Sequence, residues 1–134
     1  MMMGTNRVAV LASALALVAG VALVGETPAP SYSRDVAPIL QRECAKCHGA
    51  KAQKARLDLE GPGAYGSLVN VPSTEEKEIL RVKPGDPEAS YLWLKLEHRT
   101  SKGSGMPKGW FFAGHLNEKD MAVIKRWILE GAKE

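Results

Sequence analysis

The sequence predicts an all-α domain built from short helices and long loops. Three segments combine a helix cap with an apolar side, namely residues 34–45, 87–98 and 118–130. The stretches between them are rich in glycine and proline and have no sustained period, and no strand pattern of useful length appears. A chain of 134 residues has room for one small domain with a single core.

The first helix is expected over residues 34–45, with Ser33 as its N-cap and Pro38 within about its first turn. Its apolar residues are spaced to face inward, and its C-terminal end places Cys44 in a turn. The following residues, 48–80, contain several glycines and prolines, so we expect a loop with brief helical turns at residues 66–69 and 75–80.

The second helix is expected over residues 87–98, because Asp86 is a good N-cap and Pro87 suits the first helical position. Residues 99–114 form another glycine-rich loop. Asn117 then caps a final helix over residues 118–130, which ends before Gly131. One face of this helix carries Met121, Ile124, Trp127 and Ile128.

The N-terminus, residues 1–25, differs in composition from the rest of the chain. Arg7 is the only charged residue before Glu26, and residues 8–25 are apolar apart from one serine. This stretch exceeds the roughly 7 to 15 apolar residues of a secretory signal core and approaches the roughly 18 of a membrane span. We therefore expect either a signal peptide, with cleavage after Ala22, or an N-terminal membrane anchor.

Both alternatives place the rest of the chain on the periplasmic or another extracytoplasmic side, either soluble after cleavage or anchored to the inner membrane. Residues 26–31 form a Pro-rich linker, and the folded domain is expected over residues 32–134. The 18 Lys and Arg residues are interspersed with 15 Asp and Glu residues, which gives no support for nucleic-acid binding.

The five residues Cys44 to His48 form the motif C-x-x-C-H, the attachment signature of a c-type haem. Two thiols at this spacing can each form a thioether to one porphyrin, and the adjacent His48 can then serve as the proximal iron ligand. A redox C-x-x-C motif would need a βαβ context, which is absent here. A zinc site would need two further ligands at short spacing, and a disulfide across so small a loop would add little stability.

The sixth iron position decides between electron transfer and small-ligand binding. Met106 is the favoured distal ligand, because it follows a flexible Gly-Ser-Gly segment and precedes the rigid Pro107. Met121 has the spacing of a core residue, and His98 suits a helix C-terminus. His115 is the second choice, so the distal ligand is left open between Met106 and a histidine.

Further short motifs resemble the planctomycete-type cytochrome c domain, a family of small monohaem c-type cytochromes. They occur in order from residue 35 to residue 132 as Asp35–Leu40, Cys47-His48-Gly49, Leu57-Asp58-Leu59, Pro84–Ser90, Met106-Pro107 and Trp127–Ala132. The resemblance implies an all-helical cytochrome c-like fold around one covalent haem c. It also implies covalent attachment at Cys44 and Cys47, His48 as the proximal ligand and Met106 as the distal ligand.

These observations predict an exported monohaem cytochrome c that carries single electrons between redox protein partners and is not itself an enzyme. Two alternatives stay open, namely a haem-based gas-binding or sensing module and a permanently docked haem subunit of a membrane redox complex. Arg56 is a candidate to pair with a haem propionate. The aromatic candidates for the haem pocket or core are Trp93, Trp110, Phe111, Phe112 and Trp127.

Overall fold

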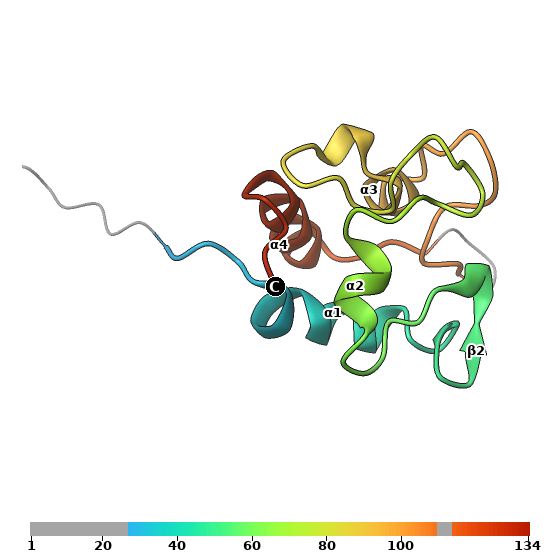
Figure 1. The fold of residues 1–134 in the computed structure, drawn as a ribbon, viewed down its shortest axis with the longest axis horizontal. Coiled ribbons are helices and arrows are strands. Elements are labelled where there is room, and N and C mark those ends of the chain that lie inside the picture. The colour runs from blue at the N-terminus through green and yellow to red at the C-terminus, as the bar shows by residue number, and fades with distance from the viewer. Residues whose placement is uncertain (1–26, 110–113) are drawn as a thin grey trace, which may run out of the picture.

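A computed structural model describes residues 27–109 and 114–134 of the chain. It has the predicted character of short helices joined by long loops, with one two-stranded hairpin (Figure 1). The α-helices are α1 (Ala37–Glu43), α2 (Ala64–Leu68), α3 (Tyr91–Leu96) and α4 (Glu118–Leu129), and the strands are β1 (His48–Gly49) and β2 (Ala52–Gln53). Trp110, Phe111 and Phe112 lie outside the described residues, as do residues 1–26.

The first helical segment begins earlier than the sequence predicts. A π-helical turn over Tyr32–Val36 runs directly into α1, and its N-cap is Ser31 rather than Ser33. Ser31 has extended backbone angles, and its hydroxyl accepts a hydrogen bond from the Arg34 amide at 3.3 Å. Helix α1 ends at Glu43, so Cys44 is its C-cap residue.

The middle of the chain is mostly loop, as expected. Helix α2 begins two residues before the predicted turn at residues 66–69. Residues 75–80, where a brief helical turn is predicted, contain one hydrogen-bonded turn, in which the Ile79 amide donates to the Glu76 carbonyl at 2.9 Å, and no helix. Ser73 holds this segment. Its hydroxyl accepts from the amides of Glu75 and Glu76, and its own amide donates to the Ile79 carbonyl at 2.8 Å.

The second predicted helix is divided into two parts. Asp86 caps a 3-10 turn over Pro87–Ala89 by accepting from the Ala89 amide at 3.0 Å. Ser90 then adopts an extended conformation and bridges to Leu80, and α3 begins only at Tyr91. The predicted helix is interrupted because the amides of Tyr91 and Leu92 donate to the carbonyls of Leu80 and Arg81, at 2.8 and 2.9 Å, instead of to carbonyls four residues earlier.

Helix α4 confirms the prediction for the C-terminal helix, including the Asn117 cap, whose side chain accepts from the Asp120 amide at 2.9 Å. Its buried face packs against the turn Tyr32–Val36, and Trp93 and Trp127 are both core residues. Among the described residues, the largest fully buried apolar side chains are Val36, Leu40, Leu59, Leu68, Val82, Leu96, Ile124, Trp127 and Ile128.

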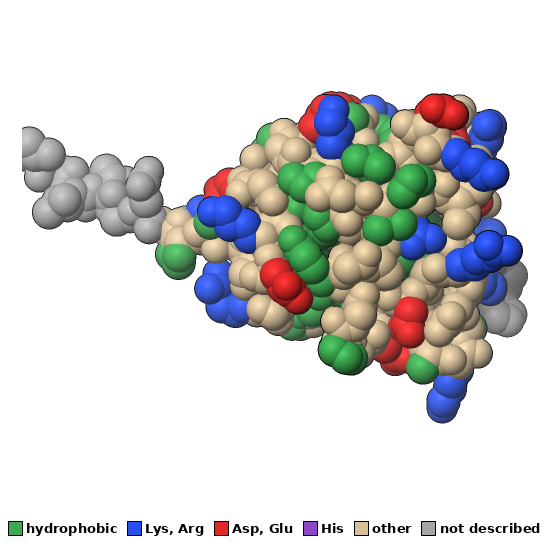
Figure 2. Space-filling model, viewed as in Figure 1, with side chains coloured by type: hydrophobic (Ala, Val, Ile, Leu, Met, Phe, Trp, Pro, Cys, Tyr) green, Lys and Arg blue, Asp and Glu red, His purple; other side chains and the backbone are tan. Residues whose placement is uncertain are grey.

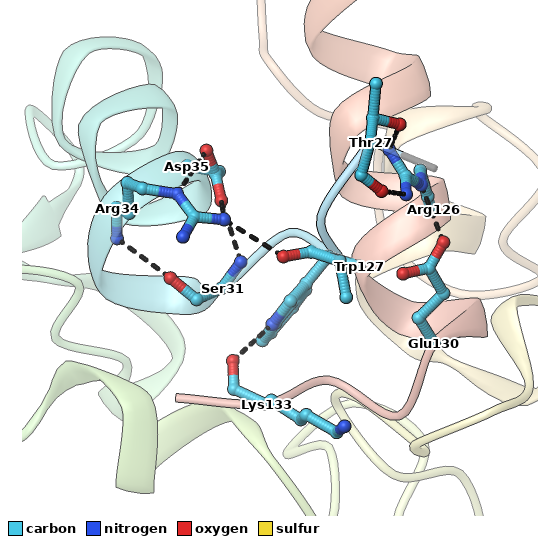
Figure 3. Close-up of polar contacts among 9 residues, drawn as sticks. Thr27, Ser31, Arg34, Asp35, Arg126, Trp127, Glu130 and Lys133 are labelled. Carbon is cyan, nitrogen blue, oxygen red and sulfur yellow. Dashed lines mark hydrogen bonds and ion pairs between the residues drawn. The ribbon is translucent and has the colours of Figure 1, made fainter. Parts of the chain in front are cut away.

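Thr27, Pro28 and Pro30 line a shallow groove together with residues of α4, and Figure 3 shows Thr27 beside Arg126 of that helix. The Arg126 guanidinium donates to the Thr27 carbonyl at 2.7 Å and to its hydroxyl at 2.8 Å. The Trp127 indole N–H and the Tyr32 backbone amide both donate to the Lys133 carbonyl. These bonds join the C-terminal residues to α4 and to the turn Tyr32–Val36. In the described part of the chain, no helix has both the length and the apolar character that crossing a membrane requires.

Candidate functional site

A cavity of about 230 Å³ lies between the end of α1, the β1–β2 hairpin and α3. It brings together three of the four residues that the sequence singled out, since Cys44, His48 and Met106 all line it. Its apolar wall consists of Leu57, Leu59, Leu68, Leu92 and Leu96. Outside the cavity, charged side chains of both signs are spread over the face shown in Figure 2.

The C-x-x-C-H motif forms a tight turn at the end of α1. The amides of Cys47 and His48 both donate to the Cys44 carbonyl, at 3.1 and 2.9 Å. Cys44 is half-buried and Cys47 is exposed, and both thiols are free. Burial, with smaller contributions from the neighbouring Glu43 and Cys47, raises the pKa of the Cys44 thiol to about 11.

His48 is held in one orientation by the hairpin that follows the turn. Its Nδ1 lies 2.8 Å from the Lys54 carbonyl oxygen. Because a carbonyl can only accept, Nδ1 carries a proton in this contact, which leaves Nε2 as the nitrogen that can bind a metal ion. Gly49 is required next to it, because a Cβ atom there would lie 2.5 Å from the Ala45 carbonyl oxygen. The turn therefore provides an imidazole held by Nδ1, with Nε2 available to a metal ion.

Met106 reaches the cavity from the loop after α3, and its amide donates to the Lys95 carbonyl at 2.8 Å. The three other candidate ligands are not among the residues that line the cavity. His98 Nε2 lies 2.8 Å from the Gly114 carbonyl oxygen, and the His98 ring packs on the ring of His115 with their centroids 4.3 Å apart. Met121 packs against the core from α4.

Arg81 is a cavity residue that the sequence analysis missed. Only 9% of it is exposed, and its guanidinium donates to the carbonyls of Ser67, Ala55 and Arg56 at 2.7, 3.0 and 3.3 Å. No carboxylate forms an ion pair with it in residues 27–109 and 114–134, and burial lowers its pKa. Arg56, the candidate named from the sequence, is exposed instead.

The available signal for Arg81 was a single charge inside the short apolar run Ile79–Val82. Its burial depends on carbonyls up to 26 positions away, which local sequence does not reveal.

The residues around the cavity fit a c-type haem in their chemistry. The cavity offers one imidazole nitrogen, one thioether sulfur, a neighbouring thiol and a leucine-rich wall, together with a buried cation suited to a carboxylate. A zinc site would require a different donor set. In the part of the chain that the structure describes, no group of three or more His, Cys, Asp or Glu side chains is placed to hold a metal ion.

Comparison with known proteins adds one finding. A family model described as Cytochrome c matches residues 34–132, which is most of the chain. Domains of that family bind covalent haem c, and the Cys44 and Cys47 pair fits the attachment site. The searches of curated proteins and of solved structures found no match.

Proposed function

Because the chain belongs to the cytochrome c family, we propose that it is an exported monohaem electron carrier whose haem iron is bound by His48 and Met106. Within the family, its short motifs favour the planctomycete-type domain. When bound, the haem supplies a one-electron couple between ferric and ferrous iron. The observation that carries the proposal is that His48 and Met106 line the same leucine-walled cavity as Cys44.

Each cavity residue has a separate role in this proposal. Cys44 and Cys47 form the thioether bonds, while the Lys54 carbonyl fixes the ring orientation and tautomer of His48. The leucines exclude water from the site. Arg81 supplies the positive charge for a haem propionate, because its guanidinium is buried without an acidic partner in the described part of the chain.

The same proposal covers location and partners. Domains of this family are typically extracytoplasmic, and the apolar residues 8–25 after Arg7 support export. We propose that residues 1–25 are a signal peptide or an anchor and that the domain exchanges electrons with other redox proteins. In this proposal the chain is not itself an enzyme and does not bind nucleic acid.

The first test is covalent attachment of the haem. Protein exported from a host with haem-attachment machinery should gain the mass of one haem, and the apoprotein mass under those conditions would contradict the proposal. The second test is Met106→Ala. Wild-type ferric protein should show the weak near-infrared absorbance of sulfur-to-iron charge transfer. The variant should lose this band, have a lower reduction potential and bind carbon monoxide in its ferrous state.

Met121→Leu is the matched control, because Met121 packs on the core rather than in the cavity. It should leave the band, the potential and carbon monoxide binding nearly unchanged. If Met106→Ala has no effect while His98→Ala or His115→Ala changes the spectrum, a histidine is the distal ligand. Immediate carbon monoxide binding by the wild type would instead support a gas-binding module.

A further inference from the structure

Residues 102–106, here called the Met106 loop, are bound to one helix. The Met106 amide donates to the Lys95 carbonyl at 2.8 Å, and the Lys95 ammonium donates to the Ser104 carbonyl at 3.0 Å. The Lys102 carbonyl accepts from the Tyr91 hydroxyl at 3.0 Å and from Lys95 Nζ at 3.4 Å. Lys95 and Tyr91 both belong to α3, so this helix determines where the loop lies.

The two donors are themselves fixed by a carboxylate. Lys95 is only 7% exposed, and its ammonium forms an ion pair with Glu75. The Tyr91 hydroxyl has one proton, which it shares between Glu75 Oε2 at 2.8 Å and the Lys102 carbonyl oxygen at 3.0 Å. These three side chains, here called the Lys95 cluster, line the same cavity as Met106. Every donor of the Lys95 ammonium has a protein acceptor, namely the carboxylate and two loop carbonyls.

The glycines of the Met106 loop allow it to approach this cluster closely. A Cβ atom at Gly103 would lie 2.5 Å from Glu75 Oε1 and 2.7 Å from Lys95 Nζ. At Gly105 it would lie 2.3 Å from the ring of His98. The sequence suggests that these glycines provide flexibility, whereas the structure places both in contact with side chains that fix the loop.

We propose that the Lys95 cluster positions Met106 at the iron and thereby keeps the sixth coordination site closed to small molecules. The inference rests on the proposed function, in which Met106 is the distal ligand. A loop with two glycines has many conformations available once it is released, and most of them would remove the thioether from the cavity. Lys95 and Tyr91 are therefore positioning residues that act on the iron site through the Met106 loop.

The test uses the haem-loaded protein with the substitutions Lys95→Met and Tyr91→Phe. Both keep most of the side-chain volume and remove hydrogen bonds to the loop. Lys83→Met is the control, because Lys83 pairs with Asp86 at 3.0 Å on the surface and does not line the cavity.

In Lys95→Met, the ferric near-infrared band should weaken, and ferrous protein should bind carbon monoxide about tenfold faster than wild type or more. Tyr91→Phe should shift both readouts less but in the same direction, and Lys83→Met should match the wild type. Hydrogen exchange at the Met106 amide should accelerate in the first two variants. A purely structural role would lower the unfolding free energy but leave the band and carbon monoxide binding unchanged.

The outcomes separate this inference from the function on which it rests. If the wild type lacks the near-infrared band, the His48 and Met106 ligation fails, and this proposal fails with it. If the wild type has the band and Met106→Ala loses it, but Lys95→Met behaves like Lys83→Met, only the positioning role is overturned. If Lys95→Met does not fold, Tyr91→Phe is the deciding variant. Carbon monoxide binding by Tyr91→Phe at the wild-type rate would then overturn the proposal.

Discussion

Gly105→Ala adds one methyl group at a position where the structure leaves no room for it. The new Cβ atom would lie 2.3 Å from both Cγ and Nδ1 of His98. The His98 ring has little freedom to move away, because its Nε2 lies 2.8 Å from the Gly114 carbonyl oxygen and its face packs on His115. The backbone of the Met106 loop must therefore shift instead.

The expected cost follows from two opposing contributions. Overpacking by one methyl group costs about 1–3 kcal/mol. Replacing glycine by alanine also restricts the unfolded chain, which returns about 0.4–1 kcal/mol. Gly105 is not among the glycines with positive φ, so no further backbone strain is added. The difference runs from about 0 to about 2.6 kcal/mol, and we expect a net loss in the free energy of unfolding near its middle, about 1.3 kcal/mol.

Gly66→Ala is the matched control. Gly66 lies within α2, and a Cβ atom there would meet nothing within 4 Å. This substitution should stabilise the protein by about 0.5–1 kcal/mol, because alanine is the better helix residue. Urea unfolding of the haem-loaded variants should therefore move the two midpoints in opposite directions at constant m-value. An unfolding midpoint for Gly105→Ala at or above that of the wild type would refute the reasoning.

Two further substitutions test buried polar groups. Burial raises the pKa of Tyr32 from 10.0 to about 12. Between these pH values the phenol ionises in the unfolded chain and stays protonated in the folded protein, so wild-type stability should fall by up to about 2.7 kcal/mol. Tyr32→Phe should remove the part of the decline in stability that comes from Tyr32. Urea unfolding of wild type and variant at pH 9 and at high pH would measure it. If the stability of both proteins declines equally, Tyr32 is not the group responsible. Arg81→Met should destabilise the haem-loaded protein by about 3–5 kcal/mol, because the propionate that Arg81 is proposed to pair with would lose its cation. The same urea assay measures this loss, and a loss as small as that of the surface variant Lys83→Met would exclude the proposed pairing.

The features that the sequence predicts correctly depend on contacts between near neighbours. The Asp86 and Asn117 caps each bond an amide three positions away, so residue type and spacing identify them. The C-x-x-C-H turn is equally local, since its two amides donate to the Cys44 carbonyl. The first cap was misassigned to Ser33 because Ser31 and Ser33 both precede the helical spacing and only backbone geometry distinguishes them.

The features that the sequence does not reveal depend on distant residues. Lys95 looks like a surface residue on a short helix, yet Glu75 and the Met106 loop bury it. Arg81 occupies an apolar run, but the carbonyls that bind its guanidinium lie in the segment after the hairpin and in α2. The close packing at Gly103 and Gly105 appears only when the loop folds back on α3 and its neighbours. Each of these is a tertiary contact without a local pattern.

The same contrast separates the two sides of the cavity. His48 is fixed by a turn and a hairpin whose contacts span a few residues, so its position depends on a short continuous segment. Met106 is fixed by groups from three separate segments, namely the loop at Glu75, helix α3 and the Met106 loop itself. If Met106 is the distal ligand as proposed, a change in any one of these segments would release its thioether while the haem stays attached through the turn. Substitutions that convert this electron carrier into a small-ligand binder should therefore concentrate on the Met106 side.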